Sequence, residues 1–151
     1  MIPLHTVCPE VAKREVRSVA VGGAPNLPDG EYAFVEFYCD DLGCDCRRVF
    51  IEVIARHRPA QVLASINFGW EKESFYRKRM PLDPKAPREV VSGSLDPINT
   101  QSEHSRALLK LFQQHVLDEP YRMRLKQHER LFHDELRRRR NPSAPPDSPR
   151  E

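Results

Sequence analysis

The chain has 151 residues and a formal net charge of +2, with 39% hydrophobic and 30% charged residues. This composition fits one domain with a modest core and some polar segments left over. No stretch approaches the roughly 20 apolar residues of a membrane helix, and the N-terminus lacks the basic and apolar regions of a signal peptide. We therefore expect a cytoplasmic protein with no membrane partner.

Four segments in the first half have the pattern of β-strands. Residues 15–21 form a short apolar run, and residues 31–38 are rich in aromatic side chains. Residues 47–55 and 61–70 alternate apolar and polar side chains, as a strand with one face on a core requires. Because the connections between these segments are short, they favour an antiparallel meander.

The second half is predicted to be mostly helical. Residues 72–99 contain four prolines and read as loop, with a short element near Phe75 or Val90. Thr100 and Glu103 fit a capping box that starts a helix, and Pro120 suits the first turn of a second. We predict one α+β domain over residues 1–140, made of an antiparallel sheet of three to four strands with two C-terminal helices packed on one face. Residues 141–151 are predicted to be a disordered tail.

Three cysteines lie within eight residues, at the turn between two predicted strands. Cys39 ends one strand, and Cys44 and Cys46 begin the next. In a reducing compartment, clustered cysteines more often bind metal or perform redox chemistry than form disulfides. Three soft sulfur ligands suit Zn²⁺ better than Mg²⁺ or Ca²⁺, which prefer oxygen. The turn at residues 39–46 is therefore predicted to hold zinc, with an unliganded cluster and a redox site as alternatives.

A structural zinc ion needs a fourth ligand, and the predicted topology ranks the candidates. If the first strand pairs antiparallel with residues 31–38, its start lies beside Cys39, and Cys8 lies only a few residues before that start. Cys8 is therefore the first candidate. His104, predicted in the first turn of a helix, is the second, and His5 is the third. The choice among these three residues stays open.

The cysteine turn also carries a resemblance. The sequence Tyr38-Cys39, followed by Gly43-Cys44-Asp45-Cys46-Arg47-Arg48-Val49, is similar to an uncharacterised bacterial family of short proteins with a Y-C-x4-C-x-C-R-R-V turn and two C-terminal helices. The segments 64–68 and 96–102 share the resemblance, which covers roughly residues 8–136. It implies no activity. It implies only that the cysteine turn and the C-terminal helices form one unit.

Basic side chains gather near the C-terminus and suggest a second kind of site. Phosphate contacts from such side chains dominate non-specific nucleic-acid affinity. A solvated helix end is the simpler interpretation, because basic residues complement the helix dipole there. His128 and His133 are interpreted as surface or packing histidines, since their spacing of five does not suit a metal-binding helix. The candidate nucleic-acid-binding residues are Arg122, Arg124, Lys126, Arg137, Arg138, Arg139 and Arg140.

These observations support three hypotheses of function. The first is a small zinc-binding protein that acts as an interaction module, with another protein as its partner. The second is a nucleic-acid-binding protein that uses the basic helix. The third is an enzyme, either a thiol redox protein or a catalytic zinc site with three protein ligands. No Gly-rich phosphate loop and no nucleophile motif is present in the sequence, so an enzyme is the less favoured class.

Overall fold

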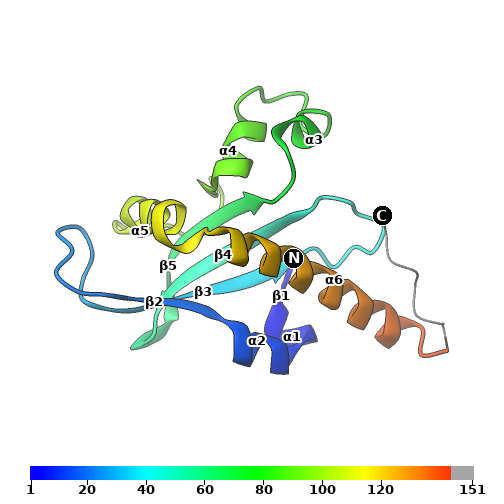
Figure 1. The fold of residues 1–151 in the computed structure, drawn as a ribbon, viewed down its shortest axis with the longest axis horizontal. Coiled ribbons are helices and arrows are strands. Elements are labelled where there is room, and N and C mark those ends of the chain that lie inside the picture. Colours follow the sequence, from blue (N-terminus) through cyan, green and yellow to red (C-terminus); the bar gives the residue numbers. More distant parts are fainter. Residues whose placement is uncertain (144–151) are drawn as a thin grey trace.

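The computed structural model describes residues 1–143; residues 144–151, most of the predicted tail, lie outside the described part. The fold is α+β, as predicted, and is built on one antiparallel sheet (Figure 1). The sheet has six strands in the order β1-β3-β4-β5-β6, and β2 pairs with β3 on the same edge as β1. The strands are β1 (Ile2–Pro3), β2 (Arg17–Val21), β3 (Gly30–Tyr38), β4 (Arg48–Ala55), β5 (Arg58–Gly69) and β6 (Ser94–Leu95).

Strands β2 to β5 form the predicted meander, since each pairs antiparallel with the next along the chain. The sheet is larger than predicted because β1 and β6 add a two-residue strand at each end. A strand of two residues is too short to show the apolar–polar alternation by which a strand is recognised in a sequence. These short strands form because neighbouring segments of the chain hold them against β3 and β5.

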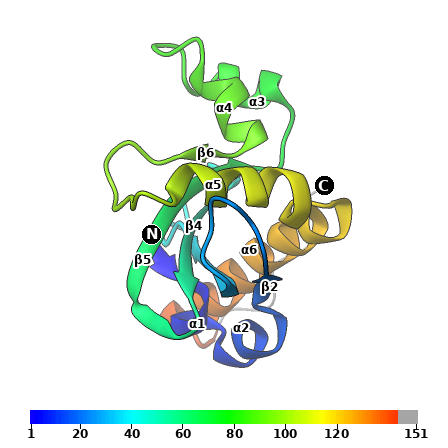
Figure 2. The same ribbon diagram turned by 90° about the vertical axis from the view of Figure 1, so that its left-hand side faces the viewer.

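Helices cover one face of the sheet and extend beyond it. Helices α5 and α6 pack on one face, as predicted, while α3 and α4 project past the end of β5 (Figures 1 and 2). No described helix is both long and apolar enough to cross a membrane. The helices are α1 (Leu4–Val7), α2 (Pro9–Glu15), α3 (Glu73–Arg77), α4 (Ala86–Ser92), α5 (Ser105–Leu111), the π-helical turn η1 (Phe112–Val116) and α6 (Glu119–Arg140).

The core lies between the sheet and the two C-terminal helices. Strand alternation sends Phe34, Ile51 and Ile66 to the helix side, where all three are fully buried. The ring of Phe112, in η1, packs on this face of the sheet, with its centroid 6.0 Å from those of both Phe34 and Phe68. The apolar stripe of α6 completes the core with Tyr121, Leu125, Phe132 and Leu136. This packing fixes α6 against the end of β3, where the cysteine turn begins.

The predicted capping box at Thr100 is wrong. Helix α5 begins at Ser105, and the Ser102 hydroxyl accepts a hydrogen bond from the His104 amide at 3.1 Å. The residues before α5 instead form hydrogen bonds with the edge of β5. The Ser65 hydroxyl donates to the Thr100 carbonyl at 2.9 Å, and the Gln101 amide bonds both backbone groups of Ser65. Unpaired strand groups need partners when partly buried, and this segment supplies them.

Candidate metal centre

The three clustered cysteines meet in the loop between β3 and β4. The sulfurs of Cys39, Cys44 and Cys46 all lie within 4.8 Å of one another, and all three residues are half-buried. At a Zn–S distance of about 2.3 Å, tetrahedral geometry puts two sulfurs about 3.8 Å apart. A metal ion therefore requires only a small inward adjustment of this loop.

The predicted local structure of the turn is partly wrong. Cys44 and Cys46 do not begin a strand, because β4 starts only at Arg48. A tight turn shapes the loop instead. Asp41 accepts the Cys44 amide on its carbonyl at 3.1 Å and the Gly43 amide on its carboxylate at 2.9 Å. This turn, rather than the alternation of a strand, brings Cys44 back towards Cys39.

The incoming half of the loop is fastened to the N-terminus and to α6. The Met1 ammonium lies 3.3 Å from the Asp40 carboxylate, and Arg140 donates to the Asp40 carbonyl at 3.0 Å. His133 is only 8% exposed, and its Nε2 donates to the Cys39 carbonyl at 2.8 Å. The backbone of Cys39 is thus held by a buried side chain of a long helix.

The outgoing half of the loop is fastened by a buried tyrosine. Arg47 has a φ of 48°, and it is the one non-glycine residue in residues 1–143 with a positive φ. Such a conformation costs on the order of 1–3 kcal/mol and persists only when its surroundings enforce it. The buried Tyr76 hydroxyl donates to the Arg47 carbonyl at 2.6 Å and accepts the Glu71 amide at 3.1 Å. Helix α3 therefore determines where the loop rejoins the sheet.

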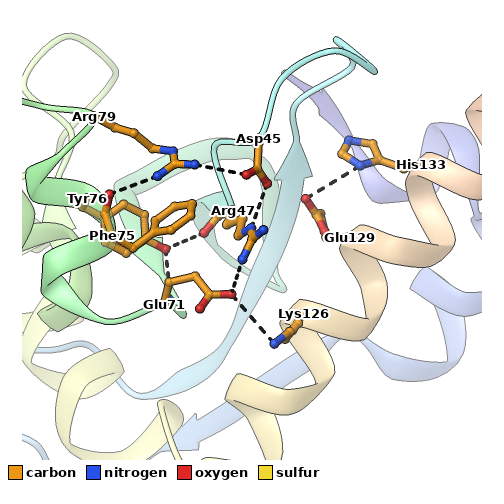
Figure 3. Close-up of polar contacts among 9 residues, drawn as sticks. All are labelled: Asp45, Arg47, Glu71, Phe75, Tyr76, Arg79, Lys126, Glu129 and His133. Carbon is orange, nitrogen blue, oxygen red and sulfur yellow. Dashed lines mark hydrogen bonds and ion pairs between the residues drawn. The ribbon is translucent and has the colours of Figure 1, made fainter. Parts of the chain in front are cut away.

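Charged side chains continue this attachment around the loop (Figure 3). Figure 3 shows Asp45 between Arg79 and Arg47, at distances of 3.1 and 2.7 Å. The guanidinium carbons of both arginines lie over the Phe75 ring, at 3.6 and 4.8 Å from its centroid. Glu71 extends the network to α6 by lying 3.3 Å from Arg47 and 3.8 Å from Lys126. The cysteine loop is therefore set by contacts with three separate elements.

The electrostatic environment does not favour free thiolates. Burial is the main cause that raises the pKa of Cys39 and of Cys44 above the ordinary value of 9.0, and Cys44 adds to the rise at Cys39 as Cys46 does at Cys44. A redox nucleophile needs the opposite shift, since the thiolate is the reactive form. A bound cation would reverse the balance, because metal coordination deprotonates thiols. The raised pKa values of Cys39 and Cys44 argue against a reactive thiolate at these two residues.

The three candidates for the fourth ligand lie elsewhere. Cys8 is outside the cluster, and its Sγ faces the Leu131 carbonyl on α6 at 3.7 Å. The register explains this, because β2 begins opposite Phe34, and β1 takes the place beside Tyr38 that was expected for the first strand. His104 lies 3.5 Å from Glu103 before α5, and His5 lines a cavity beside α2. Cys8 as a ligand stays a prediction that this geometry does not support.

The basic residues of α6 are engaged within the chain. The guanidinium of Arg122 lies over the Phe68 ring, 5.2 Å from its centroid. The other six candidates each bind a carboxylate or a carbonyl, which lowers the positive charge left for phosphates. Their partners are Glu15 for Arg124, Glu71 for Lys126, Asp134 for Arg137, Glu135 for Arg138 and Arg139, and the Asp40 carbonyl for Arg140. Nucleic-acid binding stays a prediction.

A second constellation was missed by the sequence analysis. His128 is 1% exposed and bonds Glu36 through Nδ1 at 2.7 Å and Glu15 through Nε2 at 2.9 Å. The sequence nevertheless contains a signal for this pair, in the strand period of β3 and in the helical period of α6. Glu36 falls on the same side of its strand as Phe34 and Tyr38, and His128 falls inside the apolar stripe of α6. A polar residue at a core position needs a partner, which is how this pair could have been found.

No protein-family model, no curated protein and no solved structure matches the chain.

Proposed function

We propose that this protein is a small zinc-binding interaction module, in which Cys39, Cys44 and Cys46 hold one structural zinc ion. The observation that carries the proposal is the meeting of three sulfurs within 4.8 Å in a loop held by three elements. Thiolate donors select soft or borderline metal ions, of which zinc is the commonest structural one in proteins. The role of the metal is then to fix the loop as a recognition surface.

The proposal of a protein partner rests on the place of the loop. The three sulfurs are half-buried, so one side of the cluster faces outward. No fourth histidine, cysteine or carboxylate among residues 1–143 joins the cluster. A solvent molecule or a side chain of the partner protein would complete the tetrahedron. The zinc ion would in that way link the loop to what it binds.

Elemental analysis tests the metal directly. We expect about one zinc per chain in purified protein, and loss of that zinc in Cys44→Ser. Cys8→Ser is the matched control, because Cys8 lies outside the cluster and should leave the zinc content unchanged. Protein that takes up no zinc on incubation with the ion, with Cys39, Cys44 and Cys46 all freely titrating, would overturn the proposal.

A catalytic zinc site is the second candidate, and one feature favours it. Three protein ligands with an open fourth position are the usual arrangement of catalytic zinc, and the His133 ring with Glu129 at 3.7 Å lies beside Cys39. X-ray absorption at the zinc edge would count the sulfur neighbours. Three sulfurs and one light atom fit both candidates, whereas four sulfurs would exclude an open catalytic site and would require a fourth cysteine, against the expected neutrality of Cys8→Ser.

A further inference from the structure

Helix α2 lies beside a half-open cavity of about 210 Å³. Figure 2 shows α1 and α2 together at one end of the sheet. Ala12 and Glu15 of α2 line the cavity together with Phe34 and Val35 of β3. No residue of α2 is fully buried. The position of this helix beside the cavity therefore depends on contacts other than a buried side chain of its own.

One such contact joins α2 to a buried histidine of α6. His128 is 1% exposed, and its Nε2 lies 2.9 Å from the carboxylate of Glu15, the last residue of α2. Its Nδ1 lies 2.7 Å from the carboxylate of Glu36 on β3. An ionised carboxylate only accepts hydrogen bonds, and an imidazole donates from both nitrogens only when it is protonated. The observed pair of bonds therefore requires a charged His128.

The two carboxylates differ in what each would lose with a neutral histidine. The side chain of Glu36 is 3% exposed, and a buried carboxylate that loses a donor is costly. The side chain of Glu15 is 29% exposed, and it lies 3.0 Å from Arg14 and 3.8 Å from Arg124. Glu15 can therefore turn to its arginines and to water. The proton that His128 loses is then the one on Nε2, on the side of the exposed carboxylate.

The other ionisable groups around this pair of bonds come from five elements. Burial raises the pKa of the two tyrosines among them well above its usual value, so both stay neutral from pH 6 to pH 9. The three arginines stay charged over the same range. None of these groups can take the place of His128 between the two carboxylates. They are Tyr38 on β3, Arg17 on β2, Lys13 and Arg14 on α2, His5 on α1, and Tyr121, Arg124 and Glu129 on α6.

We propose that His128 is a proton-operated latch, which holds α2 beside the cavity when it is charged and releases the helix when it is neutral. Loss of the Nε2 proton to solvent leaves a nitrogen lone pair against the carboxylate of Glu15, so the two groups separate. Helix α2 then moves away and exposes Phe34 and Val35 on the wall of the cavity. The helix is closed at lower pH and opens as the pH rises through the pKa of His128 in the folded state. The latch involves neither the cysteine loop nor a metal ion.

The tautomer of His128 tests the order of events. Nitrogen-15 NMR of the full-length protein, recorded between pH 6 and pH 9, shows which ring nitrogen carries the proton. We expect both nitrogens of His128 to be protonated at the lower pH and only Nδ1 at the higher pH. A neutral ring with its proton on Nε2 would mean that Glu36 loses its donor instead of Glu15. That result, or a ring that keeps one charge state throughout, would overturn the proposal.

Methyl NMR over the same pH range follows the helix itself. The signals of Val11 and Ala12 should move with the midpoint of His128, while Val90, buried on α4, should not respond. Loss of a hydrogen bond to a charged group changes the ratio of open to closed helix about tenfold or more. Signals of α2 that ignore the titration of His128 would contradict the latch.

Surface variants assign the response to Glu15. The amide of Glu15→Gln can accept from a charged ring and donate to a neutral one, so this variant should keep α2 closed at every pH. Glu10→Gln is the matched control, because it removes an exposed carboxylate from the same helix and should respond as the wild type does. His5→Gln should also keep the response, which separates His128 from the exposed histidine at the cavity. A pH response that survives in Glu15→Gln would overturn the proposal.

Discussion

His128 is buried between two carboxylates, and this single side chain joins α6 to β3 and α2. Replacing it by leucine leaves Glu36 buried without its charged partner. Loss of one partner of a buried ion pair costs about 3–5 kcal/mol. We predict a loss of this size in the free energy of unfolding of His128→Leu, measured by urea denaturation. His115→Leu, at an exposed position, should change it little. A loss in His128→Leu as small as that in His115→Leu would show that the ion pair contributes little.

The pH dependence of stability follows from the same residue. Burial opposes the charge of His128, but hydrogen bonds and charges from Glu36 and Glu15 outweigh it and raise the pKa of His128 above the ordinary 6.5. Its contribution is then complete below pH 6.5 and is lost as the pH rises through the pKa in the folded state. Wild type should lose more stability than His128→Gln between about pH 6 and pH 9. Parallel curves for the two proteins would contradict the raised pKa.

His133 acts on the cysteine loop through the backbone of Cys39. Residues that orient metal ligands without touching the metal usually change metal affinity about 10- to 100-fold when they are removed. We predict a loss of zinc affinity in this range for His133→Ala, measured by competition with a chelator. His57→Ala, at an exposed position, should keep wild-type affinity. A His133→Ala protein with wild-type affinity would mean that the loop holds its shape without the hydrogen bond from His133.

At the scale of elements, the sequence predicted what depends on local pattern. The alternation in residues 47–55 and 61–70 and the stripe of the last helix lead directly to β4, β5 and α6. The three clustered cysteines were found from their spacing alone. Cys8 as fourth ligand stays a prediction, and its expected place beside Cys39 depended on a first strand that runs beside Tyr38. The two-residue strand β1 takes this place, and nothing in the local sequence of two residues predicts a pairing with a distant strand.

A short element near Phe75 was predicted, and helix α3 forms there, but nothing in the sequence showed that this helix determines the geometry of the loop. Its Tyr76 hydroxyl packs directly over Gly69, at the end of β5, where a Cβ atom would overlap the ring. Gly69→Ala should therefore displace Tyr76 and destabilise the fold by about 1–3 kcal/mol. The control is Gly22→Ala, where a Cβ meets no atom within 4 Å. Thermal denaturation compares the two variants, and equal midpoints would show that Tyr76 adapts freely.

At the scale of the whole molecule, the core and the cysteine loop are built separately. The core between the sheet and helices α5 and α6 contains no cysteine of the cluster. The loop is also fastened by Tyr76, His133 and Arg140 without any metal ion. A zinc finger, in contrast, is unfolded without its metal because it has little other core. Metal and fold should therefore be coupled only in part here.

This partial coupling leads to a prediction for metal removal. A ligand that binds only the folded state stabilises it by about 2.7 kcal/mol at 100 times its dissociation constant. A chelator should lower the thermal midpoint of zinc-loaded protein while the far-UV circular dichroism at low temperature stays that of a folded α+β chain. Cys44→Ser should show no response to the chelator, since its site is broken. Complete unfolding on chelation would show that the loop, rather than the core, determines whether this chain folds.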